Sequence, residues 1–279
     1  GLVSADVSGQ TLNLVNPGNG SQPVQNNGTM QAAGGGTLQI GTDVVGGAGS
    51  RYDVDAASRI LMNGVTLSGV VNQTGTGAID TSASFSNLFS ATSLSGRVNV
   101  SSLRVSNGMA MNGGATVNVG PSSVLYFDNR TGVGAAAAQT LSGNGQIMMT
   151  GGAMRFEGGT STTWDSGITV RGSGQIGQAT QASANHTLVN NGTLIADGGA
   201  LNIIPIANAG RVTGTGTLRV DGGALSLGTG QKTNQGTLDI RGTGTLALGT
   251  QNLVLSSDYT NAQAGSGNAF NRRAGVSGT

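Results

Sequence analysis

The run Asn191-Gly-Thr-Leu-Ile-Ala-Asp-Gly-Gly-Ala-Leu-Asn-Ile203 decides the fold, because it holds two short apolar-x-apolar segments separated by a glycine corner. Alternation with a period of two places one side chain inside a sheet and the next outside. The Gly-Gly pair supplies the positive-φ backbone that turns the chain between the two segments. The run therefore predicts two short β-strands joined by a tight corner.

The same unit recurs along the chain, which indicates a repeat architecture. Within a unit, the first apolar residue precedes its counterpart by seven or eight positions, as Leu194 precedes Leu201. Between units the lead position recurs at Leu194, Leu218 and Leu238, in steps of 24 and 20 residues. The clearest copies span residues 27–40, 145–156, 191–203, 216–227 and 236–248. Short apolar pieces between the units bring the count to about three strands per repeat.

A repeat of this length fits a parallel β-helix, in which each turn stacks on the previous one and buries columns of aliphatic side chains. A β-sandwich needs no repeat, and propeller blades run to about 40 residues or more with a recurrent signature. We therefore expect an all-β parallel β-helix, a solenoid of about a dozen coils with roughly three strands each. With strands about 4.8 Å apart, it would form a rod of about 60 Å.

The domain organisation follows from the same repeat. Residues 1–279 are expected to form a single repeat region, with irregular coils or an insertion at 41–95 and an inter-repeat or capping segment at 253–279. The N-terminus lacks the layout of a signal peptide, and the last residues stop within what looks like another Gly/Thr repeat. We therefore expect the chain to be an excerpt of a longer protein.

Composition argues against several classes of protein. Of 279 residues, 51 are Gly and only 9% are charged, which argues against an ordinary helical or α/β enzyme. The 36% of hydrophobic residues and the net charge of +1 argue against highly charged disorder. One Lys and scattered Arg lack the clustered basic surface that nucleic acid requires. Zero Cys excludes disulfides and thiolate metal sites and fits a secreted bacterial protein.

The run 191–203 and the run Gly214-Thr-Gly-Thr-Leu-Arg-Val-Asp-Gly-Gly-Ala-Leu225 resemble repeats of large bacterial exoproteins of the filamentous-haemagglutinin and autotransporter-passenger type. The resemblance covers residues 26–40 and 140–255, and the segment 253–273 is similar to one that recurs between repeats in such proteins. It implies a secreted, right-handed β-helix that serves adhesion or acts as a stalk.

Carboxylates are the first candidates for chemistry, because some β-helices degrade polysaccharides with converging acids. Asp197 and Asp221 both lie three positions after a lead Leu, and Arg241 takes that place in the next coil. Stacking predicts a polar corner column of these three residues, which could be a small polar site or a weak Ca²⁺ site. The competing interpretation is a solvated turn in which Arg neutralises the column. No calcium-loop motif is present, so we expect neither a metal site nor a catalytic residue.

Other patterns give weaker signals. His186 is the only histidine, and without Cys or a flanking acid it predicts neither a zinc site nor a catalytic triad. Threonines at 213–217 and 243–245 are expected to point outward, where a flat array could bind ice or another surface. Glycine runs such as 172–174 lack the strand-to-helix context of a phosphate loop. No cofactor is expected.

Aromatic residues are scarce, so their places carry information. Tyr52, Phe85 and Phe89 lie in the irregular stretch 41–95, and loops on one face of a solenoid often carry its binding surface. They are our candidates for contact with a partner or glycan; the alternative is that they fill an irregular coil. The same two interpretations apply to Trp164, Tyr126 and Phe127, whereas Phe156 follows the apolar alternation and should be core.

The resulting functional expectation is a non-enzymatic, extracellular rod from a bacterial surface protein or filament. Its partners would be further repeats of the same protein, or other copies joined end to end, with host or environmental glycans as further candidates. A polysaccharide-binding or polysaccharide-degrading β-helix using Asp197 and Asp221 is the alternative, and a Thr-based ice-binding surface is the third. Neither a nucleic acid partner nor a transmembrane segment is expected.

Overall fold

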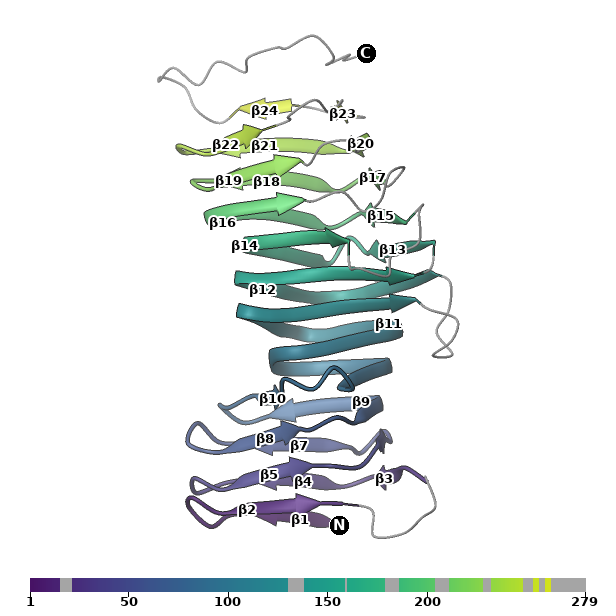
Figure 1. Ribbon diagram of the computed structural model, residues 1–279, viewed down its shortest axis with the longest axis vertical. Helices are drawn as coiled ribbons and strands as arrows, with labels where there is room; N and C mark the ends of the chain where they lie inside the picture. Colours follow the sequence, from purple (N-terminus) through teal and green to yellow (C-terminus); the bar gives the residue numbers. More distant parts are fainter. Residues whose placement is uncertain are drawn as a thin grey trace.

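The computed structural model describes residues 1–15, 22–129, 138–158, 160–178, 186–203, 211–227, 232–247, 253–255 and 259–261. The regular elements of these residues are all β-strands, and the strands stack in parallel into a β-helix of about nine turns (Figure 1). The expected all-β parallel solenoid is confirmed.

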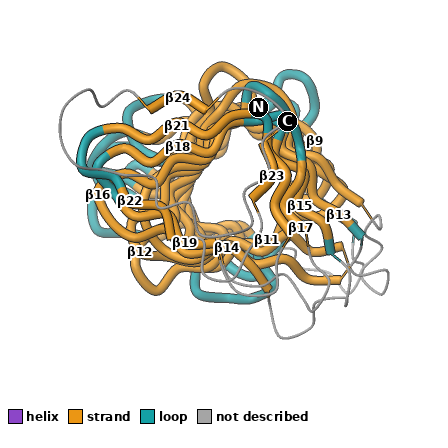
Figure 2. The backbone as a smooth tube through the Cα atoms, turned by 90° about the horizontal axis from the view of Figure 1, so that it is seen from above, coloured by secondary structure: helices purple, strands orange, loops and turns teal. Residues whose placement is uncertain are grey.

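The strands follow one another in chain order as β1 (Leu2–Ala5), β2 (Thr11–Leu14), β3 (Val24–Asn26), β4 (Thr29–Ala32), β5 (Thr37–Ile40), β6 (Val44–Gly46), β7 (Arg51–Val54), β8 (Arg59–Met62), β9 (Thr66–Thr74), β10 (Ile79–Thr81), β11 (Leu88–Asn129), β12 (Ala138–Gly158), β13 (Ser161–Trp164), β14 (Ile168–Gln178), β15 (Thr187–Asn190), β16 (Thr193–Ile203), β17 (Arg211–Thr213), β18 (Thr217–Asp221), β19 (Ala224–Leu227), β20 (Lys232–Gln235), β21 (Thr237–Arg241), β22 (Thr245–Ala247), β23 (Leu253–Leu255) and β24 (Tyr259–Asn261). The longest of them, β11, β12, β14 and β16, continue around corners of the helix (Figures 1 and 2).

Repeat positions in the sequence become columns in the structure. Leu194 of β16 pairs with Leu218 of β18, which in turn pairs with Leu238 of β21. All three side chains are fully buried, whereas Thr217 and Arg219, which flank Leu218 in β18, are partly exposed. A view along the axis shows the strands of successive turns lying over one another around the core (Figure 2). The repeat read from the lead Leu therefore gives the correct register in this part of the chain.

The number of turns is lower than the expected dozen, because several turns are longer than the 20–24-residue repeat. Leu12 pairs with Leu38, and Val117 of β11 pairs with Ile147 of β12, thirty positions later. Residues 41–95 contain β6 to β10 and the start of β11, and these strands join the same stack. For example, Leu38 pairs with Ile60 and Val44 with Leu67. Of the segment 253–279, only β23 and β24 lie within the described residues.

Large side chains fill the interior of the β-helix. Trp164, Tyr52, Phe89, Phe127 and Phe156 are among the largest side chains that are fully buried. The core placement expected for Phe156 is confirmed, and Phe127 and Trp164 belong to the same interior. Phe127 and Phe156 are register partners in neighbouring turns, and their rings stack with centroids 5.6 Å apart.

Candidate functional site

The three aromatic candidates from the irregular stretch occupy different environments. Tyr52 pairs with Met30 and Phe89 with Leu67, and both aromatic side chains are fully buried in the core. A buried ring cannot contact a partner, so the binding interpretation is wrong for these two residues and they fill their turns instead. Phe85 differs, because 43% of it is exposed.

Phe85 belongs to a cluster on the side of the rod. Its ring meets the ring of Tyr126 edge to face, with centroids 5.0 Å apart and an interplanar angle of 78°. The guanidinium of Arg104 lies 4.5 Å from the Phe85 centroid, a geometry that favours a cation–π interaction. Arg104 also forms an ion pair with the fully buried Asp128, which fixes the guanidinium beneath the ring. The exposed Phe85 is therefore held in place by partners from later turns.

Arg155 continues this cluster into the next turn. It is the register partner of Tyr126, and its Nη2 donates a hydrogen bond of 2.7 Å to Oε1 of Gln175, one turn further on. Nη1 of Arg155 is buried and has no hydrogen-bond partner among the described residues. Burial lowers the pKa of Arg155, although the nearby Tyr126 acts in the opposite direction. We call Phe85, Tyr126, Arg155 and Gln175 the aromatic–arginine patch.

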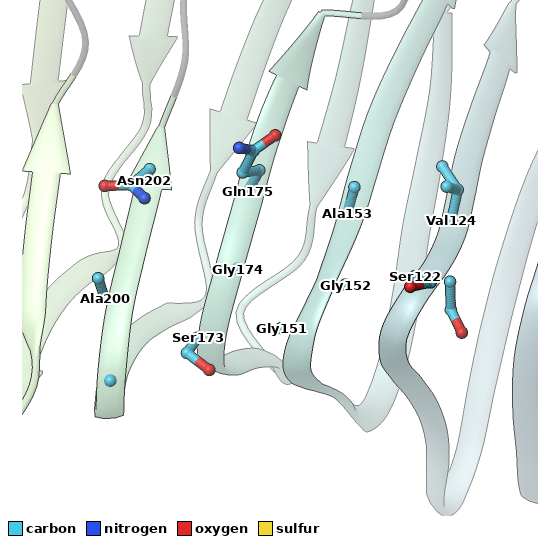
Figure 3. Close-up of a pocket in the computed structure, with 12 residues that line it drawn as sticks. Ser122, Val124, Gly151, Gly152, Ala153, Ser173, Gly174, Gln175, Ala200 and Asn202 are labelled. Atoms are coloured by element: carbon cyan, nitrogen blue, oxygen red, sulfur yellow. The ribbon is translucent and has the colours of Figure 1, made fainter.

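A groove of about 540 Å³ adjoins the aromatic–arginine patch and shares Gln175 with it. The outward side chains of four successive turns line it in register, since Val124 pairs with Ala153, Ala153 with Gln175 and Gln175 with Asn202. Serine, glycine and alanine make up most of the remaining lining, as Ser122, Ser173, Gly151, Gly174 and Ala200 show in Figure 3. The groove is hollow because these side chains are small, and it crosses the turns roughly along the rod axis.

Gly152 and Gly174 in this lining are required by close packing of neighbouring turns. A Cβ atom on Gly174 would lie 2.2 Å from the carbonyl oxygen of Gly152, and Gly174 has a φ of +134°. A Cβ atom on Gly152 would likewise lie 2.4 Å from the carbonyl oxygen of Gly120. Backbone contacts between turns therefore determine the shape of the groove.

No protein-family model, no curated protein and no solved structure matches this chain. The functional argument therefore rests on the residues themselves. Within the described ranges, no helix is long and apolar enough to cross a membrane. The described side chains also contain no group of three or more His, Asp or Glu residues placed to hold a metal ion.

The predicted corner column exists, but its charges pair differently from the expectation. Asp197 pairs in register with Asp221, and Asp221 with Arg241. The carboxylate of Asp197 accepts a hydrogen bond of 2.9 Å from Nε of Arg171, and Arg241 donates one of 2.9 Å to Asp239 instead of to Asp221. Asp221 remains exposed. Asp197 and Arg241 thus each pair with a residue outside the column, namely Arg171 and Asp239. Asp197 and Asp221 do not form a pair of free carboxylates.

Asp239 forms ion pairs with two arginines, Arg219 and Arg241. Nε of Arg219 and Nε of Arg241 each donate a hydrogen bond of 2.9 Å to the same carboxylate oxygen. Burial alone would raise the pKa of Asp239, but the hydrogen bonds from Arg241 and Arg219 outweigh it and hold the pKa below its ordinary value. A lowered pKa in the folded state means that the ionised carboxylate stabilises the fold.

The Asp239→Asn variant is expected to lose about 1–2 kcal/mol of unfolding free energy at neutral pH, because two charge-assisted hydrogen bonds are weakened. The contribution of Asp239 is fully present above the unfolded-state pKa of about 3.9 and is lost as the pH falls through the lower folded-state pKa. The difference between wild type and variant should therefore shrink below about pH 4. Urea unfolding at several pH values measures both effects.

Asp221→Asn provides the matched control, since Asp221 is an exposed carboxylate on a neighbouring strand. It should change the unfolding free energy by no more than about 0.5 kcal/mol. If both Asn variants lost the same stability, the effect would reflect net charge and not the Asp239 ion pairs.

Two further groups from the sequence have clear places. His186 is fully buried; its Nδ1 lies 3.1 Å from the carbonyl oxygen of Gly158, and its ring stacks on Phe156. Of the threonines expected to point outward, Thr215, Thr243 and Thr245 are exposed and Thr213 and Thr217 are partly exposed. Thr217 forms a column with Thr193 and Thr237 in successive turns. The adjacent outward column holds Ile195, Arg219 and Asp239, so this threonine column is a single file and not a flat two-dimensional array.

Sequence reasoning missed Arg104, Asp128, Arg155 and Gln175, although one signal was present. The segments Leu125-Tyr-Phe-Asp128 and Met154-Arg-Phe-Glu157 share the order apolar, variable, Phe, acid. In the structure they pair residue by residue, with Asp128 opposite Glu157. Aligning these two segments would have placed Tyr126 beside Arg155.

The first turn presents a second surface, at the N-terminal end of the rod. Leu2, Val7 and Val15 are 63%, 60% and 58% exposed, and Leu12 is 42% exposed. Within the described residues, β1 pairs only with β4 and β2 only with β5, so the opposite edges of β1 and β2 face away from the stack (Figure 1). This end combines unpaired strand edges with apolar side chains.

Proposed function

We propose that this chain is a non-enzymatic, structural and adhesive β-helical rod. It would act as a stalk or passenger segment of a secreted bacterial surface protein, of the filamentous-haemagglutinin or autotransporter type, or as part of a filament. The stacked apolar columns and continuous parallel pairing support a stiff rod that needs no disulfide. The resemblance of the repeats supports the surface location.

The observation that carries this proposal is that the first turn has unpaired strand edges and exposed apolar side chains. Unpaired strand edges are sites of pairing with another β-layer, and soluble proteins normally protect them with charge, proline or a cap. Here Leu2, Val7, Leu12 and Val15 leave the edge apolar. A further solenoid turn would cover these side chains and pair with the free edges of β1 and β2. We infer that the N-terminal face joins another β-helical turn, from the same protein or from another copy.

This inference predicts end-to-end association of the purified chain. Negative-stain electron microscopy over a series of concentrations should show rods whose lengths are multiples of a shortest length. A variant with Leu2→Asp and Leu12→Lys should remain at the shortest length, because charges at the edge oppose strand pairing. Analytical ultracentrifugation gives the corresponding masses in solution.

Met148→Lys is the control, because Met148 is 36% exposed but lies on the side of the rod. It should associate as the wild type does. Wild-type rods of one constant length at every concentration would contradict the pairing of this end, and so would association that persists in the charged-edge variant.

A further inference from the structure

We propose that the aromatic–arginine patch and the adjoining groove bind an acidic polysaccharide, with Arg155 pairing a uronate carboxylate and Phe85 and Tyr126 contacting sugar rings. The inference rests on the adhesive part of the proposed function and adds the site and the ligand class. It does not depend on how the ends of the rod associate.

The first argument is the uncompensated charge of Arg155. Most described arginines near an acid form ion pairs, as Arg171 does with Asp197 and Arg219 with Asp239. Among the described residues, Arg155 donates a hydrogen bond to the neutral amide of Gln175 and keeps a buried Nη1 without a hydrogen-bond partner. A buried donor without a partner is costly, and a guanidinium offers a planar fork that fits a carboxylate. The missing partner of Arg155 is therefore an anion.

Neither the nearest carboxylate on the strand of Arg155 nor the register partner of that carboxylate in the preceding turn supplies this anion. Glu157 lies two positions after Arg155 on the same strand, but it is only 4% exposed and forms no ion pair with Arg155. Asp128, the register partner of Glu157, is fully buried and bound by Arg104. Beyond Arg155 in the column comes Gly177, which has no side chain. No side chain of the next turn therefore stands opposite Arg155 in this column.

The second argument is the pair of contacting aromatic rings of Phe85 and Tyr126, of which Tyr126 is the register partner of Arg155. Phe85 is 43% exposed, and Tyr126 is partly exposed beside it. Tyr126 presents an apolar ring together with a hydroxyl that forms no hydrogen bond within the described residues. Rings with an apolar face and a polar tip suit ligands that also have apolar and polar faces, as sugar rings do. The cation–π contact with Arg104 stabilises the position of the Phe85 ring.

The third argument is the direction of the groove. Its lining comes from four successive turns, which stack at the strand spacing of about 4.8 Å. Three of these turns contribute polar side chains, namely Ser122 in the first, Ser173 and Gln175 in the third and Asn202 in the fourth. A linear polymer laid along the axis would meet a side-chain hydroxyl or amide in three of these four turns (Figure 3).

Binding of oligogalacturonate tests the proposal, with isothermal titration calorimetry of the full chain at low salt. We expect oligogalacturonate to bind and neutral dextran oligosaccharides of similar length not to bind. Arg155→Gln should weaken the affinity by about tenfold or more, because a hydrogen-bonded charge pair is lost. Phe85→Ala should weaken it by several-fold. Circular dichroism melting confirms that each variant is folded.

Arg51→Gln is the matched control, because Arg51, like Arg155, bonds a neutral group, here the hydroxyl of Thr74, and forms no ion pair within the described residues. It changes the net charge equally and should leave the affinity within about twofold. If Arg155→Gln does not fold, Gln175→Ala replaces it, since Gln175 is exposed and bonds Arg155.

Three results would overturn the proposal: equal weakening by Arg155→Gln and Arg51→Gln, equal binding of dextran, or equally tight binding of free acetate. The last result would indicate a simple anion site. Rod length in electron microscopy should be the same for Arg155→Gln and wild type, so failure of this site and failure of end-to-end pairing are distinguishable.

Discussion

Gly172→Ala is expected to cost about 3 kcal/mol or more of unfolding free energy, although it adds a single methyl group. Gly172 has a φ of +116°, which side-chain-bearing residues rarely adopt, and a Cβ atom there would lie 1.9 Å from the carbonyl oxygen of Met149. Met149 is the register partner of Gly172 in the preceding turn. The methyl group must therefore separate two paired turns, and guanidinium unfolding followed by circular dichroism measures the loss.

Gly198→Ala separates the two causes of this loss. Gly198 also has a positive φ, +72°, but nothing lies within 4 Å of a Cβ atom built there. Only the backbone strain remains, which costs about 1–2 kcal/mol. Equal losses in the two alanine variants would show that the close approach of the turns at Gly172 contributes nothing.

The repeats made the fold predictable because a solenoid converts sequence spacing into register. Leu194, Leu218 and Leu238 were expected in one column from their spacing alone, and the structure pairs them in that way. The column of Asp197 and Asp221 followed from the same count. Where units repeat closely, period-two alternation and a glycine corner suffice to say which side chains point inward.

Sequence spacing does not predict the register where turns change length. Val117 and Ile147 are paired across thirty residues, so no fixed period connects Tyr126 with Arg155. Side chains of the aromatic–arginine patch come from turns on both sides of this longer turn. Whether Tyr126 and Arg155 lie side by side depends on the number of residues in this longer turn. Composition and alternation do not give that number.

Tyr52 and Phe89 were misjudged for a different reason. The binding prediction rests on the scarcity of aromatic residues and on the irregular stretch 41–95. It does not use the alternation of inward and outward residues along each strand. Tyr52 alternates with Val54 in Arg51-Tyr-Asp-Val54, and both are buried. Near Phe89 the alternation is broken, because Ala91 has a φ of +48° and the pairing with β9 shifts between Ser90 and Thr92. The phase was readable for Tyr52, whereas for Phe89 a β-bulge hid it.

Trp164→Ala is expected to cost about 3–5 kcal/mol, because the fully buried indole leaves a cavity that the stacked turns cannot close. Trp164 pairs with Leu141 in the turn before and with Asn190 in the turn after. Each turn of a solenoid contacts only its neighbours, so the loss should weaken the junction between β12, β13 and β15 and spare distant turns. Hydrogen exchange resolved by peptide should show faster exchange in these strands and unchanged protection in β4 to β8.

Trp164→Phe keeps most of the apolar volume and should cost clearly less than Trp164→Ala, since a smaller cavity remains. Exchange that rises uniformly along the rod in Trp164→Ala, with a single unfolding transition, would contradict nearest-neighbour behaviour. Local exchange would instead mean that the rod tolerates a defect in one turn while its N-terminal face stays ordered. That tolerance is what a long stalk requires, because damage in one turn then leaves the turns on either side able to carry load.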